Sequence, residues 1–130
     1  MTNASKRLLL IDDDPDIQSI AEIGLSMVTD WSLMLASSGT EGLAIALKNP
    51  LDAIILDVMM PDMDGLETLR RLRENPETRD IPVIFLTAKV QASDRKVLYS
   101  AGANGMISKP FDPLTLPGQI AGFLQWSLPS

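Results

Sequence analysis

The sequence predicts an α/β fold in which a parallel five-stranded sheet is covered by helices on both faces. Five short apolar runs alternate with helical patterns, and these runs lack the in–out alternation of strands that have one face in water. Such alternation implies parallel strands joined by right-handed crossovers. The length of 130 residues is close to the commonest domain size, so we expect a single domain over residues 1–130.

The strand candidates are short runs rich in aliphatic side chains. The run Ala53-Ile54-Ile55-Leu56 is apolar at every position, which is typical of a strand buried on both faces. The predicted strands are 7–12 (RLLLID), 32–37 (SLMLAS), 52–57 (DAIILD), 82–87 (PVIFLT) and 105–108 (GMIS).

Capping residues mark where the first three helices begin. A polar N-cap followed by Pro at the first helical position, or by Glu three residues later, favours a helix start. Asn49-Pro50 ends the second helix. The capping pairs are Asp14 with Pro15, Ser38 with Glu41, and Asp64 with Glu67.

The last two helices are less regular. The fourth is expected over residues 92–101, ended by Gly102. Asp112-Pro113 resembles a helix start, but Pro117 would then lie past the first turn and clash with the preceding backbone. We therefore expect a loose turn at 113–116 and a helix from about Leu116 to Ser127.

The composition excludes several classes of function. The net charge is −6, with 17 acidic and 11 basic residues, which argues against direct binding to nucleic acid or to an anionic membrane surface. No apolar run approaches the ~20 residues that span a bilayer, and no signal peptide is evident, so we expect a cytoplasmic protein. Because the chain has no Cys and no His, any bound metal must be held by oxygen, which points to a hard cation.

Charged and polar side chains stand at the predicted strand ends. Ligands of open parallel sheets bind outside the carboxyl ends of the strands. Asp12 and Asp13 end the first strand, Asp57 the third and Thr87 the fourth, while Lys109 follows the fifth. Three carboxylates brought together cannot all stay ionised without cost. A divalent cation would relieve the repulsion, and oxygen ligands favour Mg²⁺ shared with a phosphate.

Four motifs carry a resemblance to a known family. The stretches LLLIDDDP, IILDVMMPDMDGLE, VIFLTA and SKPFDP, in this order and at these spacings, resemble the receiver domain of response regulators in bacterial two-component signalling. The resemblance covers essentially the whole chain. It implies a flavodoxin-like sheet with strand order 2-1-3-4-5, as in the chemotaxis regulator. It also implies a signalling switch rather than an enzyme with external turnover, with no effector domain in this chain.

The resemblance implies a phosphoacceptor and a metal site. Asp57 would attack a phosphoryl group and become an acyl phosphate. Asp13 would coordinate Mg²⁺ directly, with help from Asp12, from Asp57 and from the backbone carbonyl of Met59.

The resemblance also implies contacts to the transferred phosphoryl group. Thr87 and Lys109 would each bind one of its oxygens, and the bond from Lys109 to Pro110 is expected to be cis. The family's aromatic switch residue stands three positions before the lysine, where this chain has Met106. Methionine is flexible and apolar, so the coupling to the output is expected to be weaker or to follow a different path.

The expected partners follow from the same resemblance. The phosphodonor would be a histidine kinase or a phosphotransfer protein. The target would be a protein that meets the face formed by the fourth helix, the fifth strand and the fifth helix. We expect a monomer or a weak dimer.

Other functions stay open from the sequence alone. The chain could be a receiver excised from a hybrid histidine kinase or a larger regulator, or a pseudo-receiver that binds partners without phosphorylation. An aspartate-nucleophile phosphatase would require a second acid at the position of Met59. A flavin protein would require a phosphate-binding loop after the first strand, where Asp12, Asp13 and Asp14 would repel the phosphate.

Overall fold

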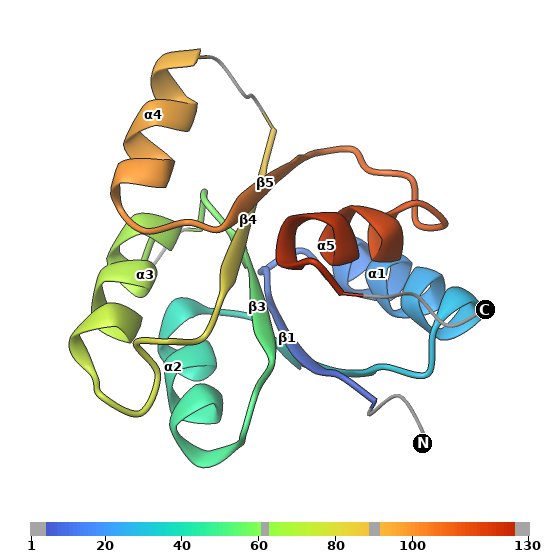
Figure 1. Cartoon of the computed structure of the whole chain (residues 1–130), viewed down its shortest axis with the longest axis horizontal. Coiled ribbons are helices and arrows are strands. Elements are labelled where there is room, and N and C mark those ends of the chain that lie inside the picture. Colours follow the sequence, from blue (N-terminus) through green and yellow to red (C-terminus); the bar gives the residue numbers. More distant parts are fainter. Residues whose placement is uncertain (1–4, 61–62, 89–91, 127–130) are drawn as a thin grey trace.

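The computed structural model describes residues 5–60, 63–88 and 92–126 (Figure 1). A five-stranded parallel sheet has the order β2-β1-β3-β4-β5, which confirms the predicted fold class and strand order. The strands are β1 (Arg7–Ile11), β2 (Ser32–Ala36), β3 (Ala53–Asp57), β4 (Val83–Thr87) and β5 (Gly105–Ser108). The helices are α1 (Pro15–Val28), α2 (Gly39–Lys48), α3 (Gly65–Glu74), α4 (Ala92–Ser100) and α5 (Leu116–Leu124).

Helices cover both faces of the sheet, as Figure 1 shows. Side chains alternate along β1, so that Leu8 and Leu10 pack under α1 and α5 while Leu9 and Ile11 pack toward α2, α3 and α4. All of β3 and β4 is buried. The unbroken apolar runs in the sequence therefore reflect burial on two sides, and no helix in the described ranges could span a bilayer.

The predicted capping residues hold the first turns of three helices. The side chains of Asp14, Ser38 and Asp64 accept hydrogen bonds from backbone N–H groups two or three residues later, at the starts of α1, α2 and α3. The Glu41 carboxylate accepts from the N–H of Ser37, one residue before the cap. These bonds fix where each helix leaves the edge of the sheet that carries the acidic residues.

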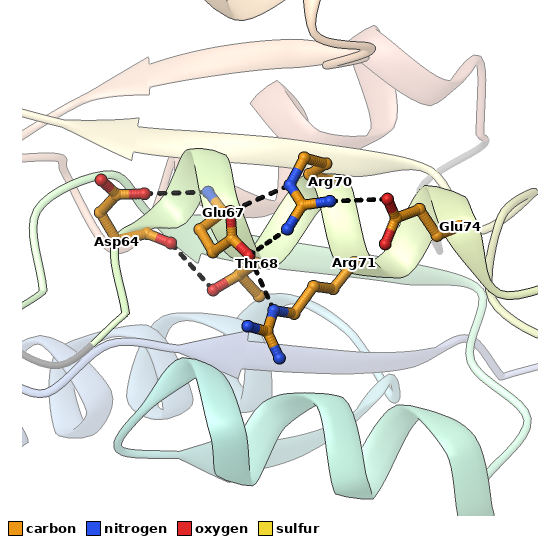
Figure 2. Close-up of polar contacts among 6 residues, drawn as sticks. All are labelled: Asp64, Glu67, Thr68, Arg70, Arg71 and Glu74. Atoms are coloured by element: carbon orange, nitrogen blue, oxygen red, sulfur yellow. Dashed lines mark hydrogen bonds and ion pairs between the residues drawn. The ribbon is translucent and has the colours of Figure 1, made fainter.

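Helix α3 carries a network of ion pairs on its exposed face (Figure 2). The carboxylate of Glu67 pairs with Arg70 and Arg71, and Arg70 also contacts Glu74 at 2.6 Å. The Arg70 and Arg71 guanidinium groups hold the pKa of Glu67 down to about 2. Each partner is three or four residues from the next, the spacing that brings side chains together on a helix.

Helix α5 ends earlier than the sequence predicted. Its first turn contains Pro117, as expected, after a turn over residues 113–115. The helix was expected to reach residue 127, but it ends at Leu124, and Gln125 adopts a left-handed conformation with φ of 59°. Glycine is the usual signal for such an end. Because Gln125 is not glycine, the sequence carried no sign of this stop.

Helix α1 approaches the turn before α5 very closely. A Cβ added to Gly24 would lie 2.1 Å from the carbonyl oxygen of Pro113. Only the absence of a side chain at Gly24 allows this contact. The glycine therefore sets the distance between α1 and the start of α5.

An aromatic cluster closes the edge of the sheet where β1 and β2 begin. The rings of Trp31 and Trp126 meet edge to face with centroids 5.3 Å apart. The ammonium of Lys6 lies 4.9 Å from the centroid of Trp126. This arrangement allows an attractive cation–π contact. The cluster packs the segment after α5 against the segment before β1.

Candidate active site

The carboxyl ends of the strands bring the acidic residues together. Asp12 and Asp13 directly follow β1, and Asp57 is the last residue of β3. One carboxylate oxygen from each of these three residues lies within 4.8 Å of the other two. Asp12 and Asp57 are buried, whereas Asp13 is exposed. The structure thus places all three predicted acids in one cluster, in which the carboxylate of Asp13 is open to solvent.

Lys109 supplies the positive charge at this cluster. Its Nζ lies 3.1 Å from Asp12 Oδ2 and 3.0 Å from Asp57 Oδ1. The Lys109–Pro110 peptide bond is cis, and the backbone N–H of Lys109 donates to the carbonyl of Thr87 at 2.9 Å. That hydrogen bond joins the segment after β5 to the end of β4, where Thr87 is also buried. Lys109 and Thr87 therefore lie at the same edge of the sheet as Asp57.

Burial controls the electrostatics of Asp12. Desolvation raises the pKa of its carboxyl, and repulsion from Asp57 adds to this rise. The N–H of Asp14 and the ammonium of Lys109 oppose it without cancelling it. Asp12 Oδ2 is buried, and its close contact in the described chain is the ammonium of Lys109 at 3.1 Å. The Asp12 charge is therefore only partly compensated.

Lys109 stays protonated in this setting. Burial lowers its pKa, but the hydrogen bonds that Lys109 donates to Asp57 and Asp12, together with attraction to both carboxylates, outweigh burial, so the net pKa is raised. A fixed ammonium at this place would attract an anion that approaches the three aspartates.

Met59 and Met106 lie where the sequence suggested a role. The N–H of Met59 points to Asp57 Oδ1 at 3.4 Å, and its side chain is 75% exposed. Met106 lies beside Phe85 in the sheet and packs, half-buried, on the core under α3 and α4. A cavity of about 490 Å³ adjoins the site on this side, lined by Val58, Met59, Leu66, Thr87, Ala88, Val97 and Leu98.

The donor set fits a hard divalent cation. All the ligands on offer are oxygen atoms, the cluster has three carboxylates, and its exposed member leaves room for water. The negative charge of Asp12 is only partly compensated, so a bound cation would stabilise the ionised carboxylate. The residues present therefore suit Mg²⁺.

One polar contact at this edge was not anticipated from the sequence. The side-chain amide of Gln18, in the first turns of α1, donates to the carbonyl of Asp12 at 2.7 Å. Glutamine on a helix is ordinary, so neither residue type nor spacing gave any signal of the contact.

The fold and site define a receiver domain of two-component signalling. The chain matches the family model of the response regulator receiver domain over residues 8–121, and it belongs to that family. Receiver domains are signalling switches that meet histidine kinases and downstream targets, and they bind Mg²⁺ at an acidic pocket.

Curated relatives of this chain include longer regulators. The chain is 37% identical over 119 residues to the DNA-binding dual master transcriptional regulator RpaA of Synechocystis sp., covering 92% of this chain and 49% of that protein. It spans about half the length of the curated relatives that it matches first.

Solved structures agree with the fold. The chemotaxis response regulator CheY4 of Vibrio cholerae has a TM-score of 0.86 at 29% identity, over 92% of this chain and 99% of that one. The receiver domain of the sensor histidine kinase PA1611 from Pseudomonas aeruginosa holds a magnesium ion in its active site cleft. It has a TM-score of 0.82 at 29% identity, over 94% of this chain and 99% of that one.

Proposed function

We propose that this receiver accepts a phosphoryl group on Asp57 and thereby switches its contacts with a protein partner. The main support is the cluster of Asp12, Asp13 and Asp57, within 4.8 Å of one another, together with Lys109 at 3.0 Å from the Asp57 carboxylate. Acids, ammonium and the Thr87 hydroxyl group come from four different strand ends, so the sheet itself assembles the set.

The proposed reaction transfers a phosphoryl group from the phosphodonor to the carboxylate of Asp57. A carboxylate oxygen of Asp57 forms the new bond to phosphorus while the bond from phosphorus to the leaving group breaks. The electron pair departs with the imidazole of a phosphohistidine or with the acyl oxygen of a small acyl phosphate. Such transfers depend mainly on positioning and on neutralising charge. Lys109 and Thr87 would each contact one oxygen of the bound phosphoryl group.

Asp12, Asp13, Asp57 and the backbone carbonyl of Met59 would hold Mg²⁺. The ion, when bound, would offset the negative charge on the phosphoryl oxygens. The magnesium-bound receiver of the Pseudomonas kinase supports this assignment, since the two chains share the fold over almost their full lengths.

The proposed partners are a phosphodonor and a protein target. The donor is a histidine kinase or a phosphotransfer protein. Phosphorylation would bias a two-state equilibrium at the face of α4, β5 and α5, which the target reads. Met106 of β5 would take part through packing, since it has neither ring nor hydroxyl. On this proposal the domain acts in the cytoplasm, as a monomer or weak dimer.

Two kinds of longer protein are compatible with this function. Synechocystis RpaA is a DNA-binding regulator about twice as long as this chain, and the Pseudomonas receiver is part of a sensor kinase. The present receiver could serve in either setting, and a phosphorylation-independent binding module is the rival function.

Intact mass measured after incubation with acetyl phosphate and Mg²⁺ tests the proposal. We expect the wild type to gain the mass of one phosphoryl group. Asp57→Asn should gain nothing, because the amide cannot form the acyl phosphate. Asp30→Asn is the matched control, since it makes the same change at an exposed carboxylate between α1 and β2.

The outcomes separate the two functions. An adduct in the wild type and in Asp30→Asn, lost with chelation of Mg²⁺ and in Asp57→Asn, supports the phosphoacceptor. A folded wild type that forms no adduct and gives no response to beryllofluoride would favour the phosphorylation-independent module.

A further inference from the structure

The side-chain amide of Gln18 joins the ends of β1 and β2 from its place on α1. Its Nε2 donates to the carbonyl oxygen of Asp12 at 2.7 Å and to Ser37 Oγ at 3.2 Å. A carbonyl oxygen can only accept, so the amide nitrogen must face Asp12. The two hydrogens of one NH₂ group are thus shared between the two strand ends.

Gln18 completes the set of contacts that fix Asp12. The N–H of Asp12 donates to the carbonyl of Ala36 at 3.0 Å, and its Oδ1 accepts from the N–H of Asp14 at 2.9 Å. Its Oδ2 pairs with Lys109 at 3.1 Å. The carbonyl oxygen is the remaining polar atom, and Gln18 is its partner. With all four atoms held, the residue cannot rotate without breaking a contact.

The contact with Gln18 also holds the peptide unit that leads into Asp13. The carbonyl of Asp12 and the nitrogen of Asp13 belong to one planar peptide unit. A bond that holds the carbonyl therefore fixes the plane from which Asp13 continues. Asp13 is the exposed member of the three-carboxylate cluster, and within residues 5–60, 63–88 and 92–126 no hydrogen bond holds its side chain in place. Its position depends on the backbone more than that of the buried Asp12 or Asp57.

We propose that Gln18 is a positioning residue for the magnesium site. It acts through the peptide between Asp12 and Asp13 and touches neither the ion nor the phosphoryl group. This inference rests on the proposed function, because it presumes that the three carboxylates bind Mg²⁺. Groups that orient metal ligands typically contribute about 10- to 100-fold in metal affinity.

The test measures Mg²⁺ affinity of the folded protein in the absence of a phosphodonor. Gln18→Met keeps the length and helix propensity of the side chain but cannot donate a hydrogen bond. We expect its dissociation constant for Mg²⁺, from calorimetric titration at 20 °C, to rise about 10-fold. The backbone amide resonance of Asp13 should shift or broaden in the metal-free variant, because its peptide plane is released.

Two matched variants separate this role from a general effect on α1. Ser19→Met places the same side chain one residue further along the helix, at an exposed position. Ser37→Ala removes the 3.2 Å contact and keeps the bond from Gln18 to Asp12. Both should bind Mg²⁺ as the wild type does.

The results distinguish this inference from the proposed function. If the wild type binds Mg²⁺ and Gln18→Met binds it equally well, the positioning role is wrong and the metal site stands. A lower melting temperature of Gln18→Met with unchanged affinity would also overturn it, since that describes a purely structural contact. A wild type that binds no Mg²⁺ would overturn both.

Discussion

At the scale of single residues, the buried carboxylate of Asp12 lowers the stability of the folded protein at neutral pH. Burial and the neighbouring Asp57 raise its pKa above the ordinary value of 3.8. A carboxyl whose pKa is higher in the folded state opposes folding at neutral pH. That opposition weakens as the pH falls through the folded-state pKa, and it disappears below 3.8. The buried Asp12 carboxylate therefore lowers the stability of the metal-free fold at neutral pH.

Replacing Asp12 by Asn should therefore stabilise the metal-free protein. The amide keeps an acceptor for the N–H of Asp14 and removes the buried charge. We expect the free energy of unfolding at pH 7, from urea denaturation with a chelator, to rise by about 1 kcal/mol.

A control in α1 makes the same change of charge on the surface. Asp16→Asn lies in the first turn of the helix, where an acidic side chain is favourable, so it should lose a few tenths of a kcal/mol. A loss of stability in Asp12→Asn would show that its pairing with Lys109 outweighs its burial.

Residue types at strand ends were enough to predict most of the site. Five polar residues each lie where an apolar run ends: Asp12, Asp13, Asp57, Thr87 and Lys109. Parallel strands bring their carboxyl ends to one edge of the sheet, so these residues lie together. The sequence could not show that Lys109 bridges two aspartates or that an amide holds the backbone of Asp12. Both contacts depend on side-chain direction across elements, which no local pattern encodes. The roles of these residues in phosphoryl transfer stay predictions.

At the scale of elements, α3 is stabilised by charges that do not enter the core. Its central carboxylate, Glu67, has a pKa lowered to about 2 by hydrogen bonds from Arg70 and Arg71. A lowered folded-state pKa adds stability above the unfolded value of 4.5, and that stability is lost as the pH falls toward 2. Because these side chains are exposed, salt should screen the effect.

Glu67→Gln should therefore lower the melting temperature at pH 7 but have less effect near pH 3. Thermal unfolding of variant and wild type at both pH values, with and without 1 M salt (screening length about 3 Å), measures this difference. Glu77→Gln, in the exposed turn after α3, is the control and should show little difference at either pH. An equal loss of melting temperature at pH 7 and pH 3 would mean that the substitution acts through helix propensity and not through the charge of Glu67.

The packing of α1 against the turn before α5 depends on one glycine. Gly24→Ala would force a methyl group to 2.1 Å from the Pro113 carbonyl oxygen, and backbone cannot yield as a side chain can. We expect a loss of about 1–3 kcal/mol in the free energy of unfolding.

Gly122→Ala is the matched substitution in α5. Nothing lies within 4 Å of the added atom, so helix propensity alone should act. A gain of about 0.5–1 kcal/mol is expected, measured by the same urea denaturation. A gain in stability in Gly24→Ala would contradict the prediction, because it would mean that α1 can move away from Pro113 without cost.

Most elements could be predicted because their signals are local. Unbroken apolar runs located all five strands to within a residue or two, and capping side chains located the starts of α1, α2 and α3. The end of α5 was missed because Gln125 adopts a left-handed conformation that residues of its type rarely signal. Contacts of Trp126 with Trp31 and Lys6 lie directly after this turn, and they join parts of the chain too distant for a sequence pattern.

At the scale of the whole molecule, the acidic cluster and the tryptophans lie at opposite edges of the sheet. Trp31 precedes β2 and packs on Trp126, whereas the aspartates follow β1 and β3. We expect Mg²⁺ at 100 times its dissociation constant to stabilise the fold by about 2.7 kcal/mol, or roughly 10 °C in melting temperature. Tryptophan emission of the folded protein should stay unchanged.

Sodium chloride at the same ionic strength controls for screening and should give a smaller shift in melting temperature. A change of emission with Mg²⁺, in the folded state, would contradict the expected separation. It would mean that binding alters packing across the full length of the strands.

The contact between Lys6 and Trp126 has a consequence for chain connectivity. These residues lie near the two ends of the range that the structure describes, and the Lys6 ammonium is only 4.9 Å from the centroid of the Trp126 ring. A short peptide could therefore join Trp126 to Lys6, while new termini were opened at the exposed residues 76–77 between α3 and β4. Such a circular permutant would keep every strand neighbour and leave the acidic edge untouched. For the same reason, a domain fused directly at Lys6 or Trp126 would lie on the side of the receiver that faces away from Asp57.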